Sequence, residues 1–321
     1  MKVFVAGAGG AIGRRLVPLL VAHGHEVTAM TRSHTKTRLL RALGADPVWA
    51  DGLDAAEVMR AVARSRPEVV IHQMTGLAGI KSVRNFDREF ALTNRLRTEG
   101  TDHLLAAAYM VGARRFIAQS FGNWNYERTG PATKTEDDRL DPHPPAAQRR
   151  SLAAIRDLEA TVLNAEGITG IALRYGNFYG PGSSFAPDAE IATMLRKRAF
   201  PVIGDGAGVW SFVHLDDAAT ATLAAMERGE AGVYNVADDD PAPVAEWLPV
   251  LARALGAPTP RRVPVWLGRI MAGEVGVSLM TQIRGASNAK AKRELGWAPR
   301  YASWREGFAD GLDDAPLSAA A

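Results

Sequence analysis

The first thirty residues constrain the fold most strongly. They open with a short apolar run over residues 3–6, which is followed by three glycines at three-residue spacing, Gly7, Gly10 and Gly13. Apolar residues then recur at helical spacing. A strand, a glycine turn and a helix in this order predict a βα unit that binds a dinucleotide. Glycines let the backbone approach a pyrophosphate, whose charge is stabilised at the helix N-terminus.

The residues after the second predicted strand bear on the choice of cofactor. The strand at residues 26–30 is followed by Arg32, Ser33 and Lys36, with no Asp or Glu among residues 31–36. An acid at the tip of this strand would hold the ribose 2′-hydroxyl of NAD and repel a 2′-phosphate. Because the acid is absent and phosphate donors are present, the sequence favours NADP(H) over NAD(H).

Strands and helices alternate through the first half of the chain. We predict further strands at residues 47–50, 69–72, 115–119 and 172–175, and helices at 37–43, 55–65, 86–110 and 151–165. This alternation predicts an α/β fold with a Rossmann-type, doubly wound parallel sheet. We expect a dinucleotide-binding domain over residues 1–176 and a smaller substrate-binding lobe over 177–321, with a strand at 233–236 rejoining the main sheet.

Ligands of such a sheet lie beyond the carboxyl ends of its strands. The residues that follow these ends are therefore the candidates for binding the cofactor. They are Gly7, Gly9, Gly10, Ala11, Ile12, Gly13, Arg32, Ser33, Lys36, Asp51, Gly52, Gln73, Met74, Thr75, Gln119, Tyr175 and Asn177.

Composition excludes several classes of function. The chain of 321 residues has no cysteine and a formal net charge of +3. It therefore forms no disulfide or thiolate metal site, and it carries no basic surface typical of nucleic-acid binding. No signal peptide is visible, no apolar run approaches about 18 residues, and no cluster has metal-ligand spacing. We expect a cytoplasmic protein without a metal, without a membrane or nucleic-acid partner, and with a small-molecule substrate.

Several motifs together resemble the extended short-chain dehydrogenases/reductases, or NAD-dependent epimerase/dehydratase family. The resemblance covers nearly the whole chain and rests on the glycine turn and on residues 51–54, 173–182, 212–217, 233–236 and 292–297. It implies that Asn94 and Phe178 contact the cofactor and that residues 51–54 contact the adenine. It also implies a possible homodimer through the helices predicted at 86–110 and 151–165.

The catalytic residues that the resemblance implies are missing. The family uses a Ser or Thr after the fifth strand and a Tyr-x-x-x-Lys pair on the next helix, where the lysine tunes the tyrosine for acid–base catalysis. Alignment on Glu159 puts these positions at Phe121, Ser151 and Ile155. A shift of one or two residues does not restore the pair, because no tyrosine lies between residues 126 and 175.

Three other hydroxyls are candidates for the proton donor. Ser120 adjoins the missing hydroxyl position, Tyr126 belongs to an aromatic, polar loop that we place over the nicotinamide, and Tyr175 directly follows the sixth strand. Each also has a structural interpretation, as a core or surface side chain. Arg149 and Arg150 either replace the charge of the lysine or are solvated.

The second half of the chain bears on the substrate. Residues 206–211 lack the arginine with which nucleotide-sugar members of the family bind diphosphate, and residues 263–280 are rich in Trp, Leu, Ile, Val and Met. That stretch either packs as part of a lobe or lines the site, in which case the substrate is apolar. The candidate substrate contacts are Phe121, Asn123, Trp124 and Trp210.

Three functions remain open at this point. The first is an atypical NADP(H)-dependent oxidoreductase for a small or medium, rather apolar carbonyl or alcohol. The second is a non-redox isomerase, cyclase or lyase that uses the same pocket for positioning. The third is an NADP(H)-binding redox sensor without catalysis. The first is favoured by analogy with the fold.

Overall fold

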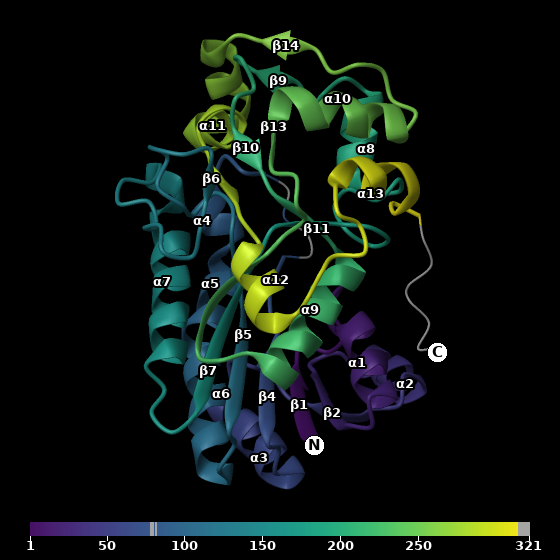
Figure 1. Ribbon diagram of the computed structural model, residues 1–321, viewed down its shortest axis with the longest axis vertical. Coiled ribbons are helices and arrows are strands. Elements are labelled where there is room, and N and C mark those ends of the chain that lie inside the picture. Colours follow the sequence, from purple (N-terminus) through teal and green to yellow (C-terminus); the bar gives the residue numbers. More distant parts are fainter. Residues whose placement is uncertain (78–79, 81, 314–321) are drawn as a thin grey trace.

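The computed structural model describes residues 1–77, 80 and 82–313. Seven strands form one parallel sheet in the lower part of Figure 1, in the order β12-β7-β5-β4-β1-β2-β3. They are β1 (Lys2–Ala6), β2 (Glu26–Thr31), β3 (Asp46–Trp49), β4 (Val69–His72), β5 (Arg115–Phe121), β7 (Thr169–Tyr175) and β12 (Gly232–Val236). The predicted doubly wound α/β fold is confirmed, including the late strand that rejoins the sheet.

Helices cover both faces of the sheet, because successive strand side chains alternate between the two faces. Val3 and Val5 share one buried cluster with α1 (Gly13–Ala22), α2 (His34–Ala42), α9 (Leu215–Arg228) and α12 (Ala289–Leu295). Phe4 and Ala6 share the other with α3 (Ala55–Ser65), α5 (Ala91–Arg97), α6 (Glu99–Val111) and α7 (Arg149–Leu163). The helices α9 and α12 lie after the boundary expected at residue 176, but they pack against the main sheet. The second half of the chain therefore contributes to both lobes.

The single helix predicted over residues 86–110 is wrong. The structure has three segments there, α4 (Phe86–Glu89), α5 and α6, with breaks at Phe90 and Thr98. The Thr98 backbone leaves the helical region (ψ −85°), and its hydroxyl donates to the carbonyl of Asn94. A threonine that bonds back in this way bends a helix. The break lies beside the carboxyl edge of β4, so it shapes the site.

The second lobe lies above that edge (Figure 1). Its helices are α8 (Glu190–Arg196), α10 (Val244–Ala254), α11 (Val265–Thr281) and α13 (Trp304–Asp310), and its short strand pairs include β10 (Val209–Trp210) with β13 (Ala242–Pro243) and β8 (Asn177–Tyr179) with β11 (Phe212–His214). Its core is aromatic and centres on buried Phe212, Trp247 and Trp304. Among the described residues, no helix has both the length and the hydropathy needed to cross a membrane.

Candidate cofactor and active site

The glycine turn after β1 packs too closely against neighbouring backbone to carry side chains. Gly7 has a φ of +86°, and a Cβ there would lie 2.6 Å from the backbone carbonyl of Gln73. A Cβ at Gly13 would meet the backbone of Ala8. The α1 helix begins at this turn without a side-chain cap. A tight turn without side chains, at an uncapped helix N-terminus, fits the pyrophosphate of a dinucleotide.

A buried arginine, which the sequence reasoning missed, fixes this turn. Arg15 Nε contacts Asp216 Oδ1 at 2.6 Å. Its Nη1 donates to the carbonyl of Ala11 at 3.0 Å, and its Nη2 donates to that of Pro181 at 2.7 Å. The turn is thereby tied to the N-terminus of α9 and to the loop after β8. Such charge-assisted bonds hold the predicted residues from Gly9 to Ile12 in place.

The predicted phosphate donors lie together at the end of β2. Arg32 and Lys36 are exposed, and Lys36 Nζ donates to the carbonyl of Gly9 at 2.8 Å. The Ser33 backbone N–H donates to Thr31 Oγ1. The segment therefore lies beside the glycine turn, as expected for residues that contact the adenosine half of a dinucleotide.

The next strand end adds the turn at Asp51 and Gly52. Asp51 Oδ1 accepts from the N–H of Leu53, and a Cβ at Gly52 would meet the side chain of Met74. The Asp51 carboxylate stabilises this turn, and Met74 packs beneath it. Asp51 and Gly52 therefore lie at the carboxyl edge of the sheet, where the sequence predicts the cofactor.

Several buried polar atoms at this edge have no partner among the described residues. They are Gln73 Oε1 after β4, Asn94 Oδ1 and both Nε and Nη1 of Arg97 on α5, and Asn123 Oδ1 after β5. Buried polar groups are normally hydrogen-bonded, so these atoms fit a site that a polar ligand completes. Together with the glycine turn, they fit a nicotinamide dinucleotide lying across the edge of the sheet.

His72, which ends β4, is structural. Its Nδ1 accepts from the backbone N–H of Met74, so its Nε2 carries the proton and donates to the carbonyl of Leu96 at 3.0 Å. Burial lowers the pKa of His72 to about 4. The ring is therefore neutral at physiological pH and holds α5 against the sheet.

Tyr175 points into the core rather than into the site. Its hydroxyl accepts from Gln73 Nε2 at 3.2 Å and lies 2.6 Å from Thr222 Oγ1. The Thr222 hydroxyl donates to the Ala218 carbonyl, so the proton of Tyr175 is directed at Thr222. Burial raises the pKa of Tyr175 to about 12. This geometry gives the candidate no path to a substrate.

Ser120 and Tyr126 meet in one buried network. Ser120 Oγ donates to Glu159 Oε1 at 2.7 Å, and Arg174 pairs with both oxygens of Glu159. The Tyr126 hydroxyl accepts from Arg174 Nη1 at 3.0 Å and donates to Asn235 Oδ1 at 2.5 Å. Burial raises the pKa of Tyr126 to about 12. The loop expected to overhang the nicotinamide is instead packed inside the protein.

The position aligned with the missing tyrosine is also closed off. The Ser151 hydroxyl donates to Asp87 Oδ1 at 2.7 Å and accepts from Asn94 Nδ2 at 3.0 Å. Asp87 also accepts the backbone N–H groups of Arg150 and Ser151, so it caps the start of α7. Ile155, aligned with the lysine, is fully buried.

Aromatic side chains surround this part of α7. The Phe86 ring stacks on Phe90 at 4.0 Å and meets the edge of Trp124 at 5.1 Å, and Phe121 lies 6.1 Å from Trp124. These rings cluster with Leu152, Ile155, Trp210 and Val275, the last from α11. The predicted contacts Phe121, Trp124 and Trp210 are therefore brought together, and the second half of α11 covers them.

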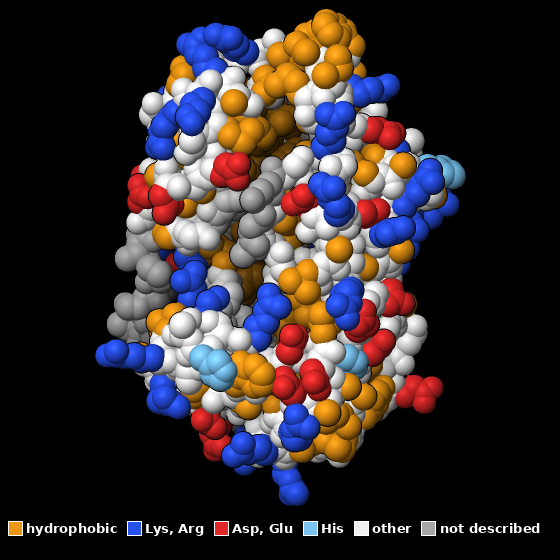
Figure 2. Space-filling view, turned by 180° about the vertical axis from the view of Figure 1, so that it is seen from behind, with side chains coloured by type: hydrophobic (Ala, Val, Ile, Leu, Met, Phe, Trp, Pro, Cys, Tyr) orange, Lys and Arg blue, Asp and Glu red, His pale blue; other side chains and the backbone are white. Residues whose placement is uncertain are grey.

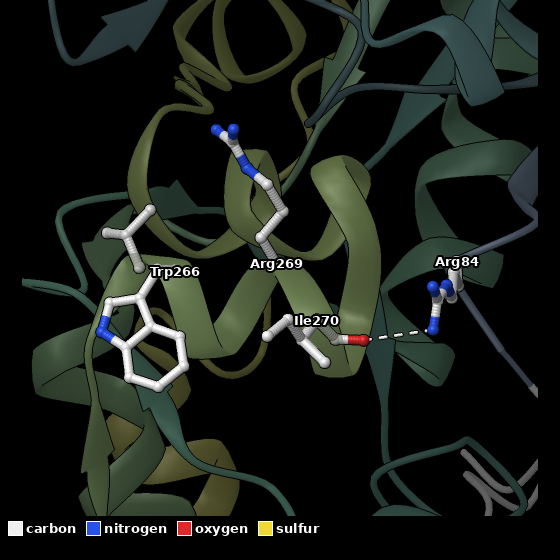
Figure 3. A pocket seen from close by; sticks show the side chains of 5 residues that line it. Arg84, Trp266, Arg269 and Ile270 are labelled. Atoms are coloured by element: carbon white, nitrogen blue, oxygen red, sulfur yellow. Dashed lines mark hydrogen bonds between the residues drawn. The ribbon is translucent and has the colours of Figure 1, made fainter.

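The first half of α11 faces outward. Trp266 and Ile270 are 65% and 60% exposed and line an open hollow with Val265, Arg84 and Arg269 (Figure 3). Arg84 Nη1 donates to the carbonyl of Ile270 at 3.1 Å, near the kink at Gly273. This hollow lies outside the aromatic cluster. Figure 2 shows a second hollow between the two lobes, with hydrophobic side chains inside it.

The remaining predicted residues are dispersed. Gln119 lies within β5 and is half-buried, and Thr75 is half-buried after β4. Asn177 pairs with Ser211 where β8 meets β11. The ring of Phe178 packs against Tyr175 at 5.4 Å. Arg149 and Arg150 are exposed. The sequence reasoning overlooked Arg97, which is buried on α5 beside Leu96; its place next to this apolar residue was the available signal.

Known proteins agree with this architecture. The family model described as "NAD dependent epimerase/dehydratase family" matches residues 3–237. The 3-diazoavenalumate denitrifying reductase of a Streptomyces species is 44% identical over 96% of this chain and 99% of that protein. The 2-alkyl-3-oxoalkanoate reductase of Stenotrophomonas maltophilia is 28% identical over 80% of this chain and 77% of that protein.

Solved structures give the same result. The Thermus thermophilus UDP-glucose 4-epimerase in complex with NAD superposes with a TM-score of 0.73 and 26% identity, over 97% of this chain and 98% of that one. The sequence match and the shared sheet, glycine turn and second lobe lead to one conclusion. The chain belongs to the NAD-dependent epimerase/dehydratase family.

Proposed function

We propose that this oxidoreductase of the epimerase/dehydratase family uses NADPH to reduce an aromatic substrate by replacing a diazo group with hydrogen. The observation that carries the proposal is the missing proton donor. The hydroxyls of Ser120, Tyr126 and Tyr175 are bonded to buried acceptors, and that of Ser151 is bonded to the half-buried Asp87. The apolar Ile155 occupies the position aligned with the lysine.

The cofactor assignment rests on the end of β2. Arg32 and Lys36 are exposed beside the glycine turn, and no acid follows the strand. A 2′-phosphate carries two negative charges that these cations would attract, whereas a ribose hydroxyl carries none. We therefore favour NADP(H) over NAD(H).

The substrate assignment follows from proton balance. When bound, NADPH supplies a hydride. Reduction of a ketone also requires a proton for the new alkoxide, and family members with a Tyr-x-x-x-Lys pair would obtain it there. When hydride replaces a diazonium group, the carbon–nitrogen bond breaks, a carbon–hydrogen bond forms and N₂ leaves as a neutral molecule. No oxygen needs a proton, so the missing acid is no obstacle.

Two further observations fit an aromatic diazo compound. Phe90, Phe121 and Trp210 present partly exposed rings beside Ile155, which suits stacking on a flat substrate. The relative at 44% identity is named for denitrifying a diazo compound. The protein would bind and orient the ring, exclude water and hold it against the nicotinamide.

A ketone is the second candidate substrate. The Stenotrophomonas relative is named as an oxoalkanoate reductase, and the apolar cluster also suits an alkyl ketone. In that case water would supply the proton.

The test offers the two substrate classes to the same preparation. Purified protein is given NADPH deuterated at C4 with either a hydroxybenzenediazonium salt or a 3-oxoalkanoate, and each mixture is compared with an enzyme-free control. We expect N₂ release and deuterium on the ring carbon. Deuterium on a carbinol carbon, without reaction of the diazonium salt, would replace the first candidate by the second.

The cofactor half is tested separately by calorimetric titration with NADPH and NADH. We expect Arg32→Ala to weaken NADPH binding about tenfold or more and to leave NADH binding nearly unchanged, because charge-assisted bonds to phosphate are lost. The exposed Arg150→Ala variant is the matched control. Equal loss for both cofactors would contradict a role in phosphate recognition.

A further inference from the structure

Arg97, the last residue of α5, is a buried cation with two nitrogen atoms that have no hydrogen-bond partner among the described residues. Its side chain is 5% exposed, and neither Nε nor Nη1 has a hydrogen-bond partner among the described residues. Burial lowers the pKa of Arg97 to about 10, so the guanidinium remains charged at neutral pH. The Glu159 carboxylate opposes this shift but makes no hydrogen bond with Nε or Nη1. Buried donors without partners are costly, and a ligand that accepts from them removes that cost.

The surrounding contacts locate this guanidinium between α5, α7 and the sheet. Asn94, one helical turn earlier, donates to Ser151 on α7. Both helices start at the carboxyl edge of the sheet and run back along it, so Arg97 lies level with the turn after Ser151, which contains Ile155. Arg97 is also close enough to His72 and Glu159 to influence them electrostatically.

This location lies on one particular side of the cofactor site. In a sheet of this order, a dinucleotide crosses at β1, with one nucleoside on the β2 side and the other on the β4 side. Arg32 and Lys36 lie on the β2 side, where we expect the phosphate-bearing adenosine. The β4 side, where α5 begins, therefore takes the nicotinamide riboside.

We propose that Arg97 binds the nicotinamide half of the cofactor, with its unpaired guanidinium N–H groups donating to ribose hydroxyl oxygens next to Ile155. The arginine holds the riboside and supplies a fixed positive charge. It does not transfer a proton, because arginine stays protonated. The inference rests on the proposed function only in requiring a nicotinamide dinucleotide. It depends neither on the phosphate preference nor on the hydride acceptor.

The test separates the two halves of the cofactor by calorimetric titration. The probes are NADPH, NADH and adenosine 2′,5′-bisphosphate, which lacks the nicotinamide riboside. We expect Arg97→Met to weaken NADPH and NADH by the same factor, about tenfold or more, and to leave the bisphosphate unchanged. Arg32→Ala should instead weaken NADPH and the bisphosphate and spare NADH. Failure of the phosphate preference alone would leave the Arg97 pattern intact.

A second measurement excludes a purely structural role. Because Arg97→Met removes a buried charge whose Nε and Nη1 donors are unpaired, the ligand-free variant should unfold at the same temperature as the wild type or higher. Arg97→Lys, which keeps a charge, should bind NADH better than Arg97→Met does. A ligand-free Arg97→Met that unfolds several degrees lower, or binds all three probes normally, would overturn the proposal. Unchanged NADPH affinity with weaker substrate binding would also overturn it, because the guanidinium would then serve the substrate.

Discussion

Tyr126 is a candidate proton donor by its chemistry, but its contacts indicate that it stabilises the fold. Its hydroxyl joins Arg174 to Asn235 inside the protein. Tyr126→Phe leaves both partners buried and lacking one bond. We expect the free energy of unfolding to fall by about 1–3 kcal/mol. Turnover per folded molecule should stay within a factor of two to three, that is, within about 0.7 kcal/mol. Urea denaturation and a steady-state assay measure the two quantities.

Tyr175→Phe provides the matched control, because its hydroxyl lies in a separate network with Gln73 and Thr222. It should also lower stability and leave turnover nearly unchanged. If either variant lost turnover by 100-fold or more while folding normally, the assignment of these hydroxyls to the protein interior would be incorrect.

The sequence could not distinguish these alternatives at the residue scale. The position of Ser120 and Tyr175 at strand ends made them candidates, but it does not say on which face of the sheet a hydroxyl lies. Whether such a hydroxyl is buried depends on partners that are distant in the sequence. The partner of Tyr126, for example, is Asn235, which lies 109 residues later. The sequence does not single out Arg97, because Arg95 lies on the same helix and only the structure shows that Arg97 is buried and Arg95 exposed.

At the scale of elements, His72 links β4 to α5, and its buried neutral ring should make the free energy of unfolding depend on pH. Folding lowers the pKa of His72 from 6.5 to about 4. Between these pH values the unfolded chain binds a proton that the folded chain does not. Stability therefore rises with pH through this window and is lost as pH falls, by up to about 3 kcal/mol. Urea denaturation at pH 4.5 and 7 measures the difference.

The control for this prediction is His72→Asn, whose side-chain oxygen can still accept from the Met74 N–H. All other ionisable groups are common to both proteins, so their contributions cancel when the two pH dependences are subtracted. The variant should lose the His72 contribution to the pH dependence, even if it is less stable at every pH. Identical pH dependences would show that His72 is not the titrating group.

Element prediction succeeded where local pattern dominates. The helix expected at 55–65 and the strand at 69–72 match α3 and β4 residue for residue. The prediction of one helix over residues 86–110 was wrong, because apolar residues recur at helical spacing across two breaks in the backbone. The breaks coincide with the Phe86–Phe90 stack and with a threonine that bonds back to the helix. The spacing of apolar residues reveals neither contact.

At the scale of the whole molecule, the two lobes are joined by several crossings of the chain and by side-chain contacts. Arg15 ties the glycine turn to the loop after β8, and Arg84 ties the loop after β4 to α11. The aromatic cluster lies between these ties, with rings from both lobes. A ligand bound there would contact both lobes at once, as in many two-lobed binding sites.

The outer surface of α6 and α7 bears on self-association. Tyr109 and Met110 at the end of α6 are 46% and 51% exposed, and Leu163 at the end of α7 is 38% exposed. The two helices pack side by side, and the resemblance to the family implies a homodimer through this part of the chain. We therefore expect these exposed apolar side chains to contribute to an interface with a second copy. We expect light scattering to give twice the 34.4 kDa of one chain. Met110→Glu should shift the mass toward the monomer, whereas Met271→Glu, on the exposed part of α11, should not. A wild-type mass of one chain at micromolar concentration would contradict the homodimer.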